Sequence, residues 1–337
     1  LENVERNAIN QTEWANVMGS ALFYRGFYFY GLLTNFALAY DEQTSDRDLG
    51  IPLRLNSNFN ERSVRAPVSE CFVQIIRDLE ASVGYLPDYP SVVTRPSKGA
   101  AYAALAKVYL YKRDYEKALE YSERALQLNA QLMDFNGDPD IINTNPNSTP
   151  FVRFHKETIF YAEMRAGLFY TTSRGTIDST LYKSYSLNDL RRPLFFRLSN
   201  GLPLFRGTYT GVTRNFGGLS TNELYLTKAE CLAFLDKKQE ALAVMDQLLV
   251  RRINNYSRNG EEFTRESLLQ FIRLERRKEL VYRNARFADI KRYNKEGANI
   301  VIRRVIDGKE YALEPNSSKY ALPLPADLVE YTGLPQN

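Results

Sequence analysis

Two stretches of this sequence share one spacing of apolar residues, and this internal repeat constrains the fold more than any other feature. The first copy begins at Gly99 and has apolar or small residues at Tyr102, Leu105, Ala106, Tyr109, Tyr115, Ala118, Ala125 and Leu128. That spacing is typical of a tetratricopeptide repeat, in which two antiparallel helices pack closely. A weaker copy begins at Asn222. We therefore expect a mainly α fold of stacked, tetratricopeptide-like helix pairs, four in all.

Residues 20–40 form the most apolar stretch of the chain and are the one candidate for a membrane span. Arg25 and Asn35 interrupt it, and a charged group at the centre of a bilayer costs about 2.5 to 3.5 kcal/mol. We therefore interpret the stretch as a core helix that is buried on most of its circumference. The helical spacing that suggests this is set by Trp14, Val17, Ala21, Tyr28, Leu32 and Phe36.

The chain between the two repeat copies, residues 134–221, has no helical period and is rich in Gly, Asn, Pro, Thr and aromatic residues. A connection of this length inside a compact protein usually carries function. We expect one domain over residues 1–337, with a helical part at 1–133, this loop-rich ligand segment at 134–221, and the second repeat with a C-terminal helix and tail at 222–337. That last helix is expected at 264–282, the chain after it is expected to be irregular, and residues 321–337 are expected to pack as extended coil.

The charge balance argues against nucleic acid as a partner. The chain has 44 basic and 40 acidic residues, a net charge of +4, and the charges are spread along its length. A basic run near the C-terminal helix includes Arg273, Arg276 and Lys278, but Glu275 and Glu279 alternate with it at helical pairing distance. We therefore interpret this run as structural ion pairs.

Few residues in the sequence offer catalytic or metal chemistry. His155 is the only histidine, and Cys71 and Cys231 are the only cysteines, both at apolar helical positions that favour buried free thiols. No metal-ligand spacing surrounds them, so we expect no metal and no cofactor. A glycosidase needs two carboxylates across a cleft. No motif pairs the available ones, which are Glu157, Glu163, Asp178 and Asp189.

Five segments, in order, resemble the SusD/RagB family of outer-membrane nutrient-binding lipoproteins. The first, residues 21–33, reads ALFYRGFYFYGLL, and the second, residues 50–87, has GIPL at 50–53 and the family's "II.DL…LP" pattern at 75–79 and 86–87. Residues 95–101 lead into the first repeat as in family members, and residues 274–280 with 286–293 look like its ERRxEL and RxxDLxRW text. The ending from Leu322 to Asn337 is similar to its LPIP and QNP text. Arg283, Asn284, Ala285, Ile290 and Tyr293 depart from the family pattern, which puts only local packing and pairing in doubt.

The resemblance implies a non-enzymatic protein on the cell surface that captures a nutrient, expected to be a glycan. It implies delivery to a TonB-dependent, SusC-like outer-membrane transporter that packs against the repeat face. Family members also carry a lipid-anchored cysteine and a helical segment upstream, which we expect to precede Leu1. A peptide-importing subunit is the nearest alternative. A repeat scaffold for a partner protein and a glycan-cleaving enzyme are more distant ones.

The ligand contacts are expected in the loop-rich segment, where aromatic residues have no helical core positions to explain them. Sugar sites combine flat apolar faces with a few polar groups. Phe169 and Tyr170 would supply the faces, and Arg165 and Arg174 the hydrogen-bond donors. Half or more of the aromatic residues in this segment are expected to cover the helical body instead.

Overall fold

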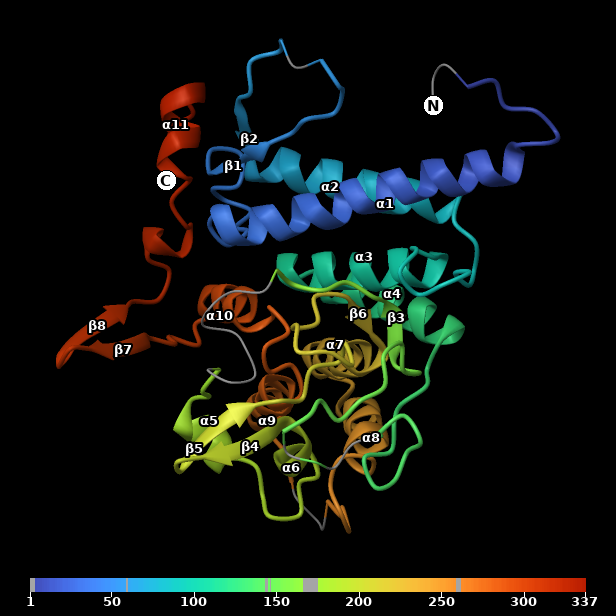
Figure 1. Cartoon of the computed structure of the whole chain (residues 1–337). Coiled ribbons are helices and arrows are strands. Elements are labelled where there is room, and N and C mark those ends of the chain that lie inside the picture. Colours follow the sequence, from blue (N-terminus) through green and yellow to red (C-terminus); the bar gives the residue numbers. More distant parts are fainter. Residues whose placement is uncertain (1–3, 59, 143–144, 146, 166–174, 259–261) are drawn as a thin grey trace. The chain divides into compact units, whose positions relative to one another are not determined.

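The fold of the computed structural model is mainly α-helical, which confirms the predicted fold class (Figure 1). The structure describes residues 4–58, 60–142, 145, 147–165, 175–258 and 262–337. Strands in these ranges occur as two-stranded antiparallel sheets. The chain divides into two compact units, unit 1 with residues 1–86, 111–114 and 286–337, and unit 2 with residues 87–110 and 115–285. That they form one domain stays a prediction.

Unit 1 is built on a close helix pair, α1 (Gln11–Phe36) and α2 (Val68–Val83). Gly26 allows the close approach, since a Cβ there would lie 2.9 Å from Leu79 Cγ. Arg25, the charge that argued against a membrane span, forms two hydrogen bonds of 2.6 and 2.7 Å to Asp78. Helix α1 therefore packs against α2, as expected of a core helix, but the expected burial on most of its circumference is wrong. No helix in the described ranges combines the length and apolar character needed to cross a membrane.

The buried face of α1 differs from the expected one. Its buried residues are Gly19, Phe23, Gly26, Tyr30, Leu33 and Thr34. Val17, Tyr28 and Leu32, which were expected inside, are 54%, 56% and 46% exposed. Aromatic residues surround the whole helix, so the hydrophobic pattern does not select a face. The two glycines select it, because only their side lets α2 and the following loop come close.

The remainder of unit 1 has more regular structure than expected. It contains β1 (Leu49–Pro52), β2 (Arg65–Pro67), α10 (Arg286–Lys295), the hairpin of β7 (Ile302–Ile306) and β8 (Lys309–Leu313), the 3₁₀ helix η1 (Ser318–Tyr320) and α11 (Ala326–Thr332). The prediction of irregular chain after the C-terminal helix is thus wrong, since α10 and the hairpin lie there. The prediction of an extended tail is wrong at α11, which is helical.

Unit 2 contains both repeat copies. They are α3 (Lys98–Lys112, whose last two residues belong to unit 1) with α4 (Tyr115–Leu128), and α7 (Thr221–Phe234) with α8 (Lys238–Leu249). The rings of Tyr109 and Tyr121 stack within the first copy at 5.5 Å. The rings of Tyr115 and Phe234 stack between the copies at 3.8 Å. Helix α9 (Arg265–Glu279) also packs on α7 and confirms the helix expected at 264–282. A fourth helix pair stays a prediction.

The loop-rich segment forms short elements around an aromatic core of its own. These are β3 (Thr158–Phe160), α5 (Ser179–Lys183), α6 (Arg191–Phe195), β4 (Phe196–Ser199), β5 (Leu202–Phe205) and β6 (Leu219–Ser220). The buried aromatic residues of the cluster are Phe135, Phe151, Tyr161, Tyr185, Phe195, Phe196, Phe205, Tyr209 and Phe216. Most aromatic residues described in this segment are therefore core, as expected for half or more of them.

Candidate functional site

The centre of unit 2 holds a network of buried charges. Arg191 pairs with Glu275 at 2.6 Å and with Glu279 at 3.2 Å. Arg252 pairs with Glu279 at 2.8 Å and with Glu157 at 2.6 Å. Burial opposes ionisation of Glu279, but the two arginines outweigh it and lower its pKa. We call these five residues the buried ionic centre, and its pairings are structural because solvent does not reach them.

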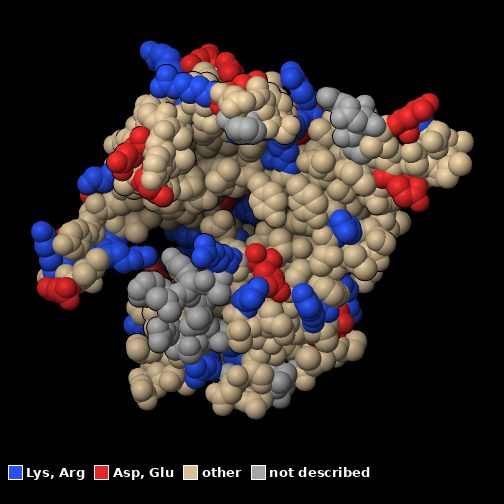
Figure 2. Space-filling model, turned by 45° about the horizontal axis from the view of Figure 1, so that its top comes forward, with Lys and Arg blue, Asp and Glu red and all other residues tan. Residues whose placement is uncertain are grey.

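The basic run on α9 is also structural, as expected. Arg273 pairs with Glu230 at 2.9 Å and Arg276 with Glu223 at 3.2 Å, both carboxylates lying on α7. The expected ion pairs within α9, such as Lys278 with Glu275, account for only some of its charged side chains. Charges of both signs are interspersed on the face in Figure 2, and most of that face carries neither. An electrostatic footprint for a phosphate backbone would instead need a one-signed patch.

The four carboxylates considered for a glycosidase each have a structural partner. Glu157 lies in the buried ionic centre, and Asp189 accepts two hydrogen bonds from the Arg191 side chain there. Asp178 caps α5 through the backbone N–H of Thr180 at 2.8 Å. Glu163 pairs with Arg214 at 3.0 Å. Each of the four carboxylates is thus held by contacts with other residues of unit 2.

His155 and the cysteines are buried as well. Nε2 of His155 lies 3.2 Å from the backbone oxygen of Tyr209. Burial, and then the charge of Arg283, lowers the pKa of His155 to about 3, so the ring is neutral at physiological pH. Cys71 and Cys231 are free and buried. Among the described residues, no group of three or more His, Cys, Asp or Glu is placed to hold a metal ion.

The expected ligand residues fall at the edge of what the structure describes. Arg165 is exposed, as a hydrogen-bond donor for a ligand has to be. Phe169, Tyr170 and Arg174 lie outside the described residues. Their role stays a prediction.

A cluster of aromatic and charged side chains lies just before Arg165 in the chain. Its members, which we call the Tyr161 cluster, are Arg153, Phe154, Tyr161, Glu163 and Arg214. The ring of Phe154 meets that of Tyr161 edge to face at 4.8 Å, and the guanidinium of Arg153 lies 4.8 Å from the centre of the Phe154 ring. The hydroxyl of Tyr161 donates to Glu163 at 2.6 Å, and Arg214 pairs with the other oxygen of Glu163. Both oxygens of the Glu163 carboxylate thus accept hydrogen bonds.

The protonation states and exposure of the Tyr161 cluster suit ligand contact. Burial, and then the hydrogen bond to Glu163, raises the pKa of Tyr161 to about 12. The same hydrogen bond lowers the pKa of Glu163, so this pair is a neutral donor and an ionised acceptor at neutral pH. Phe154 is 44% exposed, and the side chains of Arg153 and Arg214 are 53% and 60% exposed. The cluster therefore offers an apolar ring with guanidinium donors around it.

Comparisons with known proteins agree with this helical frame. Residues 1–110 match a family profile described as "Starch-binding associating with outer membrane", and residues 221–328 match the profile of the SusD family. A search among curated proteins gives no match.

Solved structures resemble the fold over nearly the whole chain. A putative sugar-binding protein from Bacteroides vulgatus is 20% identical, with a TM-score of 0.81 over 100% of this chain and 80% of that one. A SusD superfamily protein from Bacteroides thetaiotaomicron is also 20% identical, with a TM-score of 0.78 over the same shares. A SusD-like carbohydrate-binding protein from Bacteroides vulgatus is 19% identical, with a TM-score of 0.74 over 98% and 78%.

The chain has the fold of a class of mainly α-helical proteins, and in this chain helix pairs are combined with a loop-rich segment. Within that class, the two profile matches lie at both ends of the chain and together cover well over half of it. The chain belongs to the SusD/RagB family.

Proposed function

We propose that this protein captures a glycan at the cell surface and delivers it to a TonB-dependent, SusC-like transporter of the outer membrane. The family membership supports the class of function, and sugar-binding proteins are among those with the same fold. The Tyr161 cluster is the observation from which we propose the location of the binding site. It presents an exposed aromatic ring and two guanidinium groups beside the segment in which the sequence predicts the ligand contacts.

The proposed site combines the Tyr161 cluster with the expected residues Arg165, Phe169, Tyr170 and Arg174. An aromatic ring stacks on the apolar CH face of a sugar, while guanidinium donors bind its hydroxyl oxygens. Phe154 is suited to the first role because it is 44% exposed, and its backbone has a φ of +63°. A non-glycine residue in that conformation is strained, and such strain often marks a functional position.

Binding measurements on single variants test the site. Stacking of a ring in a binding site contributes about 1 to 3 kcal/mol, so Phe154→Ala and Tyr170→Ala should each weaken glycan binding about tenfold or more. The ligand is first selected from an array of glycans and peptides, and affinities are then measured by calorimetric titration. Tyr331→Ala is the matched control, since this tyrosine is 89% exposed and belongs to the other compact unit.

Thermal melting of each variant separates a lost contact from a lost fold. Unchanged affinity in both Phe154→Ala and Tyr170→Ala, or a fall in melting temperature that matches the affinity loss, would place the site elsewhere. A hit on peptides without glycans would assign the protein to peptide import. Turnover of a bound glycan would assign it to the enzymes.

Delivery to a transporter is tested by copurification. The full-length, lipid-anchored protein, expressed in a bacterium together with its SusC-like transporter, should copurify with that transporter from detergent-extracted outer membranes. Release into the medium without the barrel would contradict the delivery step, but it would leave glycan capture standing.

A further inference from the structure

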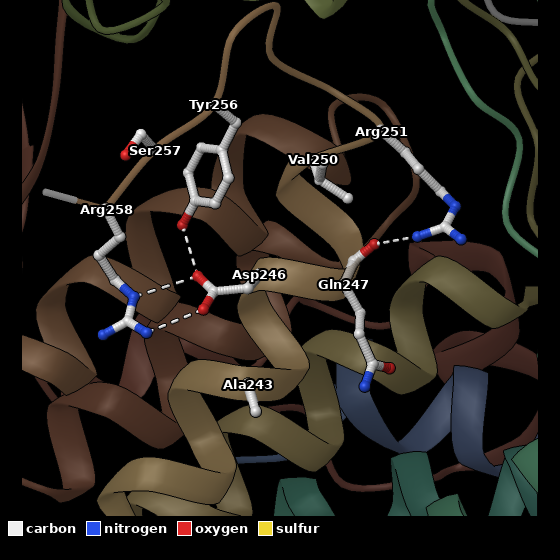
Figure 3. Close-up of a pocket in the computed structure, with 8 residues that line it drawn as sticks. All are labelled: Ala243, Asp246, Gln247, Val250, Arg251, Tyr256, Ser257 and Arg258. Carbon is white, nitrogen blue, oxygen red and sulfur yellow. Dashed lines mark hydrogen bonds and ion pairs between the residues drawn. The ribbon is translucent and has the colours of Figure 1, made fainter.

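One side of α8 faces outward and forms the floor of a groove (Figure 3). Ala243, Asp246, Gln247 and Val250 recur at steps of three and four residues, so they lie on one side of the helix. The opposite side packs into the core through Ala241, Leu242, Met245, Leu248 and Leu249. Val250 is 55% exposed at the C-terminal end of this outward stripe. The groove thus has an apolar surface that the fold itself does not bury.

The chain that follows α8 forms one wall of the groove, and Asp246 of α8 binds it through three hydrogen bonds. Asp246 accepts hydrogen bonds from the hydroxyl of Tyr256 at 2.8 Å and from Nη2 and Nε of Arg258 at 2.8 and 3.1 Å. Burial opposes ionisation of Asp246, but these donors outweigh it and lower its pKa. The wall is therefore fixed in place, and its acid and base neutralise each other.

The other end of the groove carries a charge with no such compensation. Nη1 of Arg251 donates to the backbone oxygen of Gln247 at 2.7 Å, which orients the guanidinium along the helix (Figure 3). Within the described chain, no carboxylate forms an ion pair with Arg251. A guanidinium has five N–H donors, so most of its donors remain available to a ligand.

The groove has the size and polarity of a small-molecule site. Its volume is about 810 Å³, within the range of about 300 to 1,000 Å³ that ligand sites occupy. Apolar atoms of Val250 and Ala243 lie between a neutral polar wall and one cation. This distribution matches a sugar ring, which has apolar faces and polar edges, when the sugar also carries an anionic group.

We propose that the α8 groove, lined by Ala243, Asp246, Gln247, Val250, Arg251 and Tyr256, binds a uronic acid unit of a glycan. The carboxylate pairs with Arg251, one face of the ring covers Val250, and hydroxyl groups reach the Gln247 side-chain amide. The inference rests on the proposed function for the saccharide class of the ligand. It adds a second contact point, formed by α8 and the chain after it, and a preference for acidic over neutral glycans.

The test compares three probes of matched length: trigalacturonate, the neutral galactotriose, and a triglutamate peptide. Binding to the full chain is measured by calorimetric titration at low salt. Arg251→Gln removes the cation and keeps an amide of similar length. Lys237→Gln is the control, because it removes the same charge from the opposite end of α8, where the lysine is exposed.

We expect trigalacturonate to bind and galactotriose to bind at least about tenfold more weakly at this groove, since a charge-assisted pair contributes about that factor. Arg251→Gln should weaken trigalacturonate binding about tenfold, and Lys237→Gln should change it less than twofold. Equal affinity of wild type and Arg251→Gln for trigalacturonate overturns the inference. So does triglutamate binding that matches trigalacturonate, because it would assign the groove to acidic peptides.

The outcome is separable from that of the proposed function. Glycan binding that depends on Phe154 and Tyr170, without any effect of Arg251→Gln, overturns the α8 groove and leaves the proposed function standing. Trigalacturonate binding that depends on Arg251, without any effect of Phe154→Ala or Tyr170→Ala, supports the groove and contradicts the Tyr161 cluster as the main site.

Discussion

Arg191 has no contact with solvent, and the three carboxylates that it binds are buried too. It contacts Asp189 at 2.7 Å as well as Glu275 and Glu279 of the buried ionic centre. Its neighbour Arg192 differs in every respect, because it is partly exposed and lies 4.9 Å from the centre of the Tyr182 ring. Two adjacent arginines thus separate the cost of losing a buried charge from the cost of losing a surface contact.

We predict that Arg191→Met destabilises the protein by about 3 to 5 kcal/mol, because three buried carboxylates lose the cation that they share. Arg192→Met should cost only about 0.5 to 1 kcal/mol, the value of an exposed cation–π contact. Urea unfolding followed by far-UV circular dichroism measures both. If the two variants were equally stable, the buried ionic centre would contribute nothing to the fold, and its carboxylates would be open to a functional interpretation again.

The candidate site also shows where residue-level prediction reaches its limit. Arg165 is exposed, and its donor role, like the roles of Phe169, Tyr170 and Arg174, stays a prediction. Arg153 and Arg214 were not anticipated. The neighbouring pair Arg153–Phe154 was a usable signal, since a cation beside an aromatic residue in a loop has no helical explanation. Arg214 had none, because its contact with Glu163 joins residues 51 positions apart.

At the level of elements, helical periodicity predicted those helices whose apolar residues follow a regular local spacing. The repeat copies gave α3, α4, α7 and α8, and the run after Thr264 gave α9, whose first turn is held by a capping box between Thr264 and Ser267. The face of α1 needed the tertiary contacts of Gly19 and Gly26, which no period shows. The groove beside α8 likewise depends on where the chain turns back after Val250.

The missed hairpin of β7 and β8 did have a local signal. Its turn, Asp307–Gly308, has positive φ at both residues, 49° and 77°. Asp-Gly is a strong signal for a two-residue hairpin turn because both positions tolerate that conformation. Helix α11 also had a local signal, since it begins directly after Pro325, a favourable place for a helix to start.

At the scale of the whole molecule, unit 1 is assembled from both ends of the chain. Nζ of Lys291 on α10 donates to the backbone oxygens of Thr34 at 2.8 Å and Ala37 at 2.6 Å, at the end of α1. One turn later Lys295 pairs with Asp41 at 2.8 Å. These contacts join residues about 250 positions apart, which sequence periodicity does not reveal. Unit 1 therefore completes its fold only after the C-terminal part of the chain is present.

Lys291 gives unit 1 a predictable response to pH. Burial lowers its pKa from 10.5 to about 7, whereas the unfolded chain keeps the ordinary value. Between these two values the unfolded chain binds one proton more than the folded chain, so stability rises with pH. We predict that the free energy of unfolding of unit 1 increases by about 1.5 kcal/mol from pH 7 to pH 8.5, at up to about 1.4 kcal/mol per pH unit.

The chain offers a probe of its own for this measurement. Trp14 is the only tryptophan, lies in α1 and contacts Tyr85 edge to face at 6.1 Å, so its fluorescence reports the unfolding of unit 1. Urea unfolding followed by Trp14 emission at pH 7 and 8.5 should show the increase in wild type and in Lys295→Met, whose lysine forms a surface pair. Lys291→Met should lose it, because the titrating amine is gone. A pH response that persists in Lys291→Met would show that another group titrates in this window, and that Lys291 holds the end of α1 without changing its charge.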